Sequence, residues 1–183
     1  MKKLVLAIIV FVAFDKKNIA QDSKSSYTYE QAYDLIKKDG CTLKELSAEF
    51  KRNKEIVKLA LENCPEAFQY ADESFKKDRE IVLAAVKHNA ATLNNADINL
   101  RKNRGFMLEA LESNFFTIQY IDKSLSNDRE IILVALKEDS DALNYADESL
   151  IKDRDFVLDA VNINGAALQY VDKSLKKGVM DIY

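Results

Sequence analysis

Residues 143–161 read LNYADESLIKDRDFVLDAV, and the first five of these letters recur along the chain with a 25-residue period. The same register holds FQYAD at 68–72, LNNAD at 93–97, IQYID at 118–122 and LQYVD at 168–172. A degenerate copy begins at Leu43, and residues 29–38 align as the second half of an earlier unit. Repeats this short cannot each bury an apolar face, so tandem copies stack into a solenoid. The sequence therefore predicts a single solenoid over residues 29–183 with about five and a half repeats.

The composition favours helices over sheets. The 183 residues include 4 Gly, 1 Pro and no Trp, which leaves few of the turn residues that a β-sandwich or barrel needs. Hydrophobic residues make up 48% and charged residues 31%, values that exclude a disordered chain and a polytopic membrane protein. We therefore expect an all-α, right-handed helical-repeat solenoid of short helix pairs, with a 25-residue repeat.

The apolar spacing changes once within each unit. In the first half, Phe68, Ala71 and Phe75 recur at i, i+3 and i+7, which predicts a first helix with one narrow apolar stripe. In the second half, apolar residues fill most of 81–86 and predict a second helix that is buried over a wider angle. Each unit is therefore expected to hold two short helices.

Polar residues mark both ends of the second helix. Its start is predicted at side chains that accept hydrogen bonds from free N–H groups, namely Asn53, Asp78, Asn103, Asp128 and Asp153. Its end is predicted at Asn89, Asn114, Asp139 and Asn164. We expect these four residues to adopt the left-handed conformation that glycine usually supplies after a helix, which would explain why the chain needs so few glycines.

An acidic and a basic column recur with the repeat. The acidic column is Asp72, Asp97, Asp122, Asp147 and Asp172, and the basic column is Lys54, Arg79, Arg104, Arg129 and Arg154. On a helical wheel the acidic column falls on the apolar stripe, where an unpaired carboxylate would be costly. Pairing each acid with the next base along the chain fails at Val179, whereas pairing it with the base of the preceding unit leaves none alone. We therefore predict an inter-repeat ladder of Asp72–Lys54, Asp97–Arg79, Asp122–Arg104, Asp147–Arg129 and Asp172–Arg154.

The run from Leu143 to Val161 resembles the repeats grouped as domain of unknown function 4116, and the resemblance extends over about residues 43–175. It implies a helical repeat and supplies no catalytic residues. The chain departs from the pattern near its ends, at Ser47 and Val179, and again at Asn95, which replaces the tyrosine of the motif. The two end departures suit capping units.

Two further columns are candidates for binding a partner. On the same wheel, a tyrosine column lies opposite the apolar stripe beside a column of amides, and together they comprise Tyr70, Tyr120, Tyr145, Tyr170, Gln69, Asn94, Gln119, Asn144 and Gln169. We call these residues the amide–tyrosine strip. Phenol and amide groups both donate and accept hydrogen bonds, so such a strip suits a protein, an extended peptide or a glycan. The alternative is that these side chains pack and hydrogen-bond along the solenoid itself.

Known catalytic and metal-binding patterns are missing from the sequence. It has no glycine-rich phosphate loop, no His-Glu-x-x-His and no Cys-x-x-Cys, and its one histidine, His88, is expected at the surface. We therefore expect neither an enzyme nor a cofactor or metal site. Cys41 and Cys64 are separated by nearly one repeat, so they are expected on adjacent loops, either as a disulfide or as two separate thiols.

The N-terminus has the pattern of an export signal. Met1, Lys2 and Lys3 precede an apolar run over 4–14, which as a helix covers roughly 16 Å and is too short for the ~30 Å of a bilayer core. We predict a signal peptide at 1–20, a polar linker at 21–28 and no stable membrane span. The protein would then be periplasmic or secreted. The alternative is that this segment is a buried core helix and the protein cytoplasmic.

Removal of residues 1–20 would leave 23 basic and 29 acidic residues, a net charge of −6. Because phosphate binding needs a basic face, we expect no nucleic-acid partner. The function that the sequence favours is a non-catalytic, exported protein-interaction module. The alternative is a structural or surface spacer with no specific ligand.

Overall fold

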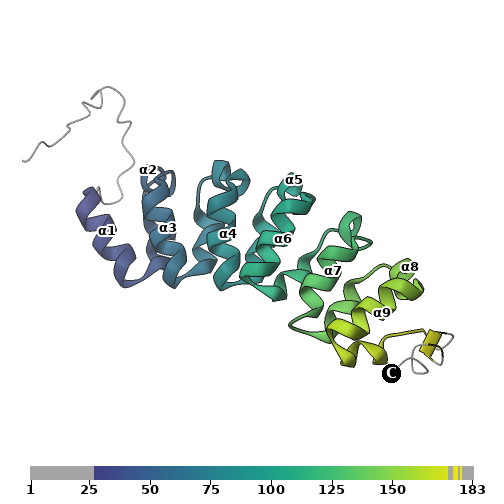
Figure 1. Ribbon diagram of the computed structural model, residues 1–183. Helices are drawn as coiled ribbons and strands as arrows, with labels where there is room; N and C mark the ends of the chain where they lie inside the picture. The colour runs from purple at the N-terminus through teal and green to yellow at the C-terminus, as the bar shows by residue number, and fades with distance from the viewer. Residues whose placement is uncertain (1–26, 173–174, 177, 179–183) are drawn as a thin grey trace, which may run out of the picture.

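The computed structural model describes residues 27–172, 175–176 and 178, which form a row of stacked helices (Figure 1). The predicted signal peptide, residues 1–20, and most of the predicted linker lie outside the described residues. Within the described part, no helix combines the length and the apolar character needed to cross a bilayer. The prediction of an all-α solenoid with a 25-residue repeat is confirmed, because equivalent helices begin at residues 54, 79, 104, 129 and 154.

The longer helices stand side by side, each contacting the next along the chain (Figure 1). The side chains predicted as N-caps accept backbone N–H groups of the first turn, as Asp78 does from Glu80 and Ile81. The wide apolar arc is also present, since Ile81, Val82 and Ala85 of α4 are fully buried. These helices are α1 (Tyr29–Lys38), α3 (Lys54–Asn63), α4 (Arg79–His88), α6 (Arg104–Ser113), α7 (Arg129–Leu136) and α9 (Arg154–Ile163).

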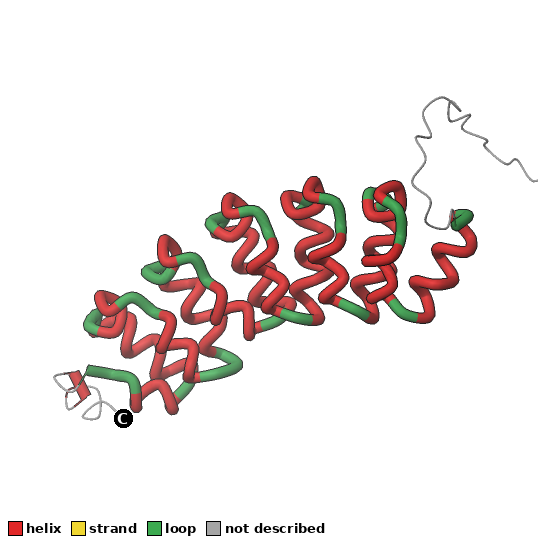
Figure 2. Tube along the Cα trace, turned by 180° about the vertical axis from the view of Figure 1, so that it is seen from behind, coloured by secondary structure: helices red, strands yellow, loops and turns green. Residues whose placement is uncertain are grey.

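A second row of short 3-10 helices packs against the first. Successive members contact one another and also the α-helices, so that a layer of buried residues such as Phe68 and Leu93 lies between the two rows. Loops gather along the edges of the solenoid (Figure 2). The 3-10 helices are η1 (Gly40–Glu45), η2 (Pro65–Tyr70), η4 (Ala90–Asn95), η5 (Phe115–Tyr120), η7 (Ser140–Tyr145) and η8 (Gly165–Gln169).

The prediction of a single first helix in each unit is wrong. The chain becomes extended at Ala71, with φ −65° and ψ 157°, and a separate short helix follows, so each unit holds three helical pieces. The residue after the break begins the next piece, because the Asp72 carboxylate accepts the backbone N–H of Ser74. These short pieces are α2 (Ala48–Lys51), η3 (Glu73–Lys77), α5 (Ile98–Arg101), η6 (Lys123–Leu125) and α8 (Glu148–Ile151).

The break lets the backbone link neighbouring units. The N–H of Asp72 donates to the carbonyl of Lys51 at 3.0 Å, and the N–H of Asp97 donates to the carbonyl of Lys76 at 2.8 Å. Within a continuous helix these N–H groups would have bonded inside their own unit. The extended residue therefore exchanges a local hydrogen bond for one that joins two repeats.

The predicted left-handed residues after the longer helices are also absent. Asn89, Asn114 and Asn164 have φ between −145° and −159°, and no described residue has a positive φ. These residues instead begin the next 3-10 helix, because the side chain of each accepts the N–H two residues ahead. The amide of Asn114 also donates to the carbonyl of Val86 in the preceding unit at 2.9 Å. Few glycines are needed because the chain turns through an extended residue.

Candidate functional site

The predicted ladder between the acidic and basic columns is wrong, because bases of that column pair with other acids. Asp72 pairs with Arg52, whose Nε lies 2.8 Å from Oδ2, instead of with Lys54. Asp97, Asp122 and Asp147 cap the short helices that follow them. None of the five pairs Asp72–Lys54, Asp97–Arg79, Asp122–Arg104, Asp147–Arg129 and Asp172–Arg154 is among the ion pairs of the described residues. The wheel argument failed because it treated two helical pieces as one continuous helix.

Three residues of the basic column form ion pairs with the N-cap aspartate of the next longer helix along the chain. Lys54 Nζ lies 2.8 Å from Asp78 Oδ2, and Arg104 Nε lies 2.6 Å from Asp128 Oδ2. The same relation joins Arg129 Nη1 to Asp153 Oδ1 at 3.4 Å.

The exceptions follow from the sequence. The N-cap facing Arg79 is the neutral Asn103, and Arg79 pairs with Glu109 at 2.6 Å instead. The slot facing Arg154 is occupied by Gly178.

These contacts shift the pKa values of the acids in the ladder. Burial acts to raise the pKa of Asp128, but the hydrogen bonds from Arg104 and from the backbone N–H of Ile131 outweigh it and lower the pKa overall. Hydrogen bonds from Lys54 and then Lys58 lower the pKa of Glu80 to about 2. The acids and bases of the ladder neutralise each other between consecutive units, so the ladder joins repeats.

The amide–tyrosine strip lies along the row of 3-10 helices. Its amides, Gln69, Asn94, Gln119, Asn144 and Gln169, are all exposed. Tyr70 is 38% exposed, whereas Tyr120, Tyr145 and Tyr170 pack partly against the core. Some members also bond along the solenoid, since the hydroxyl of Tyr170 donates to Asp141 and Gln169 Nε2 donates to Ser140 Oγ at 3.3 Å. The strip therefore combines packed rings with exposed polar groups.

An exposed aromatic residue stands in the middle of the strip and was missed by the sequence reasoning. Phe116 is 51% exposed, and its ring centroid lies 4.1 Å from that of Phe115. The other units carry no aromatic residue in these two slots, which hold Gly40–Cys41, Pro65–Glu66, Ala90–Ala91, Ser140–Asp141 and Gly165–Ala166. Comparing the repeats column by column would have found this departure.

Two cavities flank the Phe116 ring. The cavity between η4 and η5 has a volume of about 270 Å³ and is lined by residues that include Phe116, Gln119 and Tyr120. The cavity between η5 and η7 has a volume of about 110 Å³, and its lining includes Phe116, Gln119, Asn144 and Tyr145. We call Phe116, Gln119, Tyr120, Asn144 and Tyr145 the Phe116 site. Four of its five members belong to the predicted strip.

Titratable groups do not form a metal site in the described part of the chain, where no group of three or more His, Cys, Asp and Glu side chains is placed to hold an ion. His88 is exposed at the end of α4 and lines the 270 Å³ cavity together with Asn89 and Asn114. No carboxylate lines that cavity. The arrangement therefore offers His88 no acidic partner for acid–base chemistry there.

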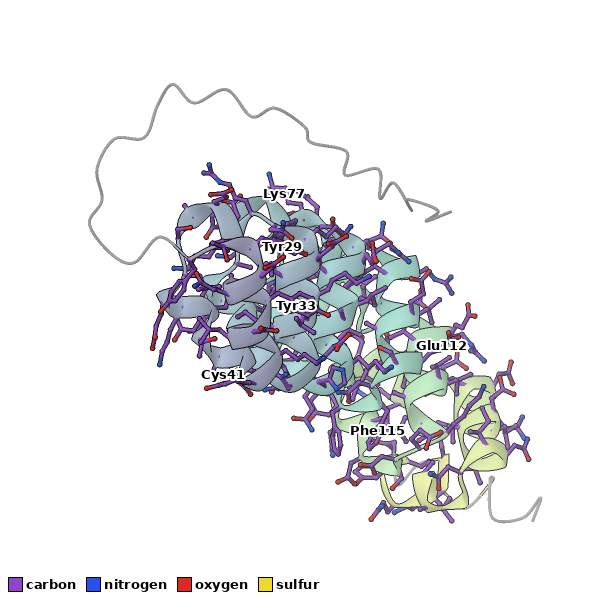
Figure 3. All side chains as sticks on the ribbon, turned by 90° about the vertical axis from the view of Figure 1, so that its left-hand side faces the viewer. Tyr29, Tyr33, Cys41, Lys77, Glu112 and Phe115 are labelled. Atoms are coloured by element: carbon purple, nitrogen blue, oxygen red, sulfur yellow. A yellow bond between two sulfur atoms is a disulfide. The ribbon has the colours of Figure 1, made fainter. Side chains whose placement is uncertain are left out.

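Cys41 and Cys64 are joined by a disulfide, with their Cα atoms 5.3 Å apart. Cys41 lies in η1, and Cys64 lies between α3 and η2, so the bond links the first two 3-10 helices. Figure 3, a view onto the N-terminal end, places Cys41 and Phe115 along one margin of the solenoid and Lys77 on the opposite margin. The same view shows Tyr29 and Tyr33 on the end face formed by α1.

Comparison with known proteins identifies the repeat. The family model described as domain of unknown function (DUF4116) matches residues 29–76, 53–101, 78–126, 103–151 and 128–176. Each match spans about two of the 25-residue units, and successive matches start about one unit apart. No curated protein and no solved structure matches the chain.

Proposed function

The chain belongs to the family described as domain of unknown function (DUF4116), and we propose that it is a non-catalytic, exported interaction module that binds an extended peptide segment of another protein at the Phe116 site. One observation carries this proposal. Phe116, the most exposed large hydrophobic side chain among the described residues, lies between two cavities that predicted strip residues also line.

Stacking of the repeats does not account for Phe116. The other units pack with cysteine, glutamate, alanine or aspartate in its slot, so the fold does not require an aromatic residue there. Leaving half of a phenylalanine in water forgoes part of the stabilisation of about 1.5–3 kcal/mol that full burial provides. Exposed aromatic residues are typical of binding surfaces, where contact with a partner recovers that energy.

The neighbouring polar groups suit a peptide backbone. The exposed amides of Gln119 and Asn144 each present a donor and an acceptor, as an extended backbone does. The cavities on the two sides of the ring provide places for side chains of the bound segment. An extended peptide lying across η4, η5 and η7 would engage all these features together.

The export part of the proposal rests on the N-terminal sequence and on the cysteines. Disulfides persist in oxidising compartments outside the cytoplasm, and the geometry of Cys41 and Cys64 permits one. Sequencing the N-terminus of the mature protein from its native source tests this directly. A chain that begins at Gln21 supports export, and one that retains Met1 contradicts it.

The binding proposal is tested with the purified chain and a phage library of random peptides. Phe116→Ala copies the residue found in the equivalent slot at Ala91, so it should leave the melting temperature unchanged. We expect selected peptides to lose at least tenfold in affinity for this variant, the size typical of removing an anchor residue. Ile98→Ala is the matched control, because Ile98 is 41% exposed and lies on a short helix away from the strip.

The outcomes separate the proposal from its alternatives. Peptides that bind wild type and the Ile98→Ala variant equally, but not the Phe116→Ala variant, support it. Failure to enrich any peptide, or enrichment that survives Phe116→Ala, contradicts it. If no peptide is enriched, the protein is better described as a spacer with no specific ligand.

A further inference from the structure

The smaller of the two cavities has a distinctive lining. On one side stand the rings of Phe115 and Phe116, and on the other stand Asp139 and Asp141, from the unit that follows. Asn144 and Tyr145 complete the polar side, and no lysine, arginine or histidine lines the cavity. The nearest base along the chain, Lys137, lines a different cavity beside Phe115 together with Glu138. The cavity therefore combines aromatic rings with two carboxylates and no base among its lining residues.

The two carboxylates keep an oxygen available. Asp139 Oδ1 accepts the N–H of Asp141 at 2.9 Å, and Asp141 Oδ1 accepts the hydroxyl of Tyr170. Neither residue forms an ion pair with any described residue, and no described hydrogen bond ends on either Oδ2. The N-cap acids Asp78, Asp128 and Asp153 each have a base from the preceding unit, as Asp128 has Arg104. These two acids lack the positive charge that the inter-unit ladder supplies elsewhere.

Aromatic faces beside carboxylates favour a cation. A lysine ammonium or an arginine guanidinium is attracted to the face of an aromatic ring within about 6 Å of its centroid. The chain uses this contact twice inside its own ladder, where Arg79 lies 5.4 Å from the centre of Phe106 and Arg129 lies 5.5 Å from the centre of Phe156. At Phe115 and Phe116 the rings and the acids are present, and the chain's own cation is not among the lining residues.

The size of the cavity indicates what fits. A volume of about 110 Å³ is below the roughly 300–1,000 Å³ of typical small-molecule pockets. It suits one side chain of a larger partner. An acidic or strongly hydrated ligand is disfavoured by Asp139 and Asp141, and a purely apolar side chain would bury the free carboxylate oxygens without a partner.

The combination of two aspartates with two phenylalanines occurs at one boundary between units. The slots of Asp139 and Asp141 hold Cys64 and Glu66 in one unit, Asn89 and Ala91 in another, and Asn164 and Ala166 in a third. Only at the start of η7 do two acids in these slots follow a unit that carries two phenylalanines. A partner that places its cation here would be held in one register along a solenoid whose other units look alike.

We propose that the cavity between η5 and η7 binds the side chain of a lysine or an arginine in the peptide segment that occupies the Phe116 site. This inference rests on the proposed function and adds the chemical class of the residue that is recognised.

The test is a positional library of acetylated decapeptides bound to the full chain, with each amino acid in turn at each position. We expect Lys and Arg to be preferred at one position by about tenfold over norleucine, as a charge-assisted contact implies. The variant Asp139→Asn/Asp141→Asn should abolish that preference. Both asparagines keep the hydrogen-bond acceptors, and asparagine already caps the equivalent helices at Asn89 and Asn114.

Glu138→Gln is the control, because it removes one charge from the residue next to Asp139. Glu138 lines the separate cavity beside Phe115 that Lys137 also lines. It should leave the preference for Lys and Arg intact. Peptides that need Phe116 but show no preference for a basic residue would overturn this inference and leave the proposed function standing. A preference that persists in the double variant would overturn it as well. If no peptide depends on Phe116, the proposed function and the inference fail together.

Discussion

Gly40 provides a sharp test of how the first two units pack. The residue is buried at the start of η1, and its N–H donates to Asn63 Oδ1 at 2.7 Å. A Cβ placed on Gly40 would lie 2.2 Å from the carbonyl oxygen of Ala60 and 2.3 Å from Asn63 Oδ1. The first of these contacts is with helix backbone, which cannot rotate away. Gly40→Ala therefore requires η1 to move away from α3.

The loss of stability in Gly40→Ala can be estimated from two contributions, the overpacking and the lost hydrogen bond. Overpacking a buried site by one methyl group typically costs about 1–3 kcal/mol. Loss of the hydrogen bond between Asn63 and Gly40 adds about 1 kcal/mol. A total of about 2–4 kcal/mol corresponds to a fall in melting temperature of about 4–16 °C for a chain of this size.

The assay is thermal unfolding followed by far-ultraviolet circular dichroism, with Gly165→Ala as the control. Gly165 occupies the equivalent slot in a later unit, where a Cβ would meet nothing within 4 Å. That substitution should leave the melting temperature unchanged or raise it slightly, because alanine has less freedom to lose on folding. Equal melting temperatures for the two variants would refute the packing described for η1 and α3.

Three further predictions concern the ladder and the disulfide. Asp128→Ala should lower the free energy of unfolding in urea by about 1–2 kcal/mol, because it removes an N-cap. Asp128→Asn keeps the cap and loses only the charge that pairs with Arg104, so it should cost under about 1 kcal/mol. Equal losses for the two variants would show that the ion pair with Arg104 is the larger contribution. The pKa of Glu80, held at about 2 by Lys54 and Lys58, lies below its ordinary value near 4.5, so its stabilisation is present above pH 4.5 and is lost as the pH falls toward 2. The melting temperature should therefore drop over that window, and less so for Glu80→Gln; identical pH profiles would contradict this. Reduction of the bond between Cys41 and Cys64 should lower stability by about 3 kcal/mol, as the 23-residue separation implies, and an unchanged urea midpoint with reductant would contradict this value.

Much of the architecture was predictable because it repeats. The 25-residue period, the wide apolar arc of the longer helices and their N-caps at residues such as Asp78 all follow from local rules of periodicity and capping. The strip amides were also placed correctly on an exposed surface. These features depend on neighbours within a single unit, and five copies of the pattern reinforce one another.

The partners of the charged residues were not predictable in the same way. The prediction paired Asp72 with Lys54, whereas the structure pairs Asp72 with Arg52 and Lys54 with Asp78. A repeated column of bases can reach forward or back, and the sequence spacing fits more than one register. The choice depends on the extended residue at Ala71, which ends the first helical piece, so the residues of the next short helix do not continue the wheel of the first.

By itself, the sequence determined that this protein is a solenoid of short helices, because a 25-residue apolar pattern can be buried only by stacking copies. Tertiary structure alone decided which atoms meet between the copies. It set the register of the ion pairs, brought Gly40 against Ala60, and placed Phe115 and Phe116 opposite Asp139 and Asp141. The physical reason is that these contacts join residues in different units, whose separation depends on the packing of the backbone between them.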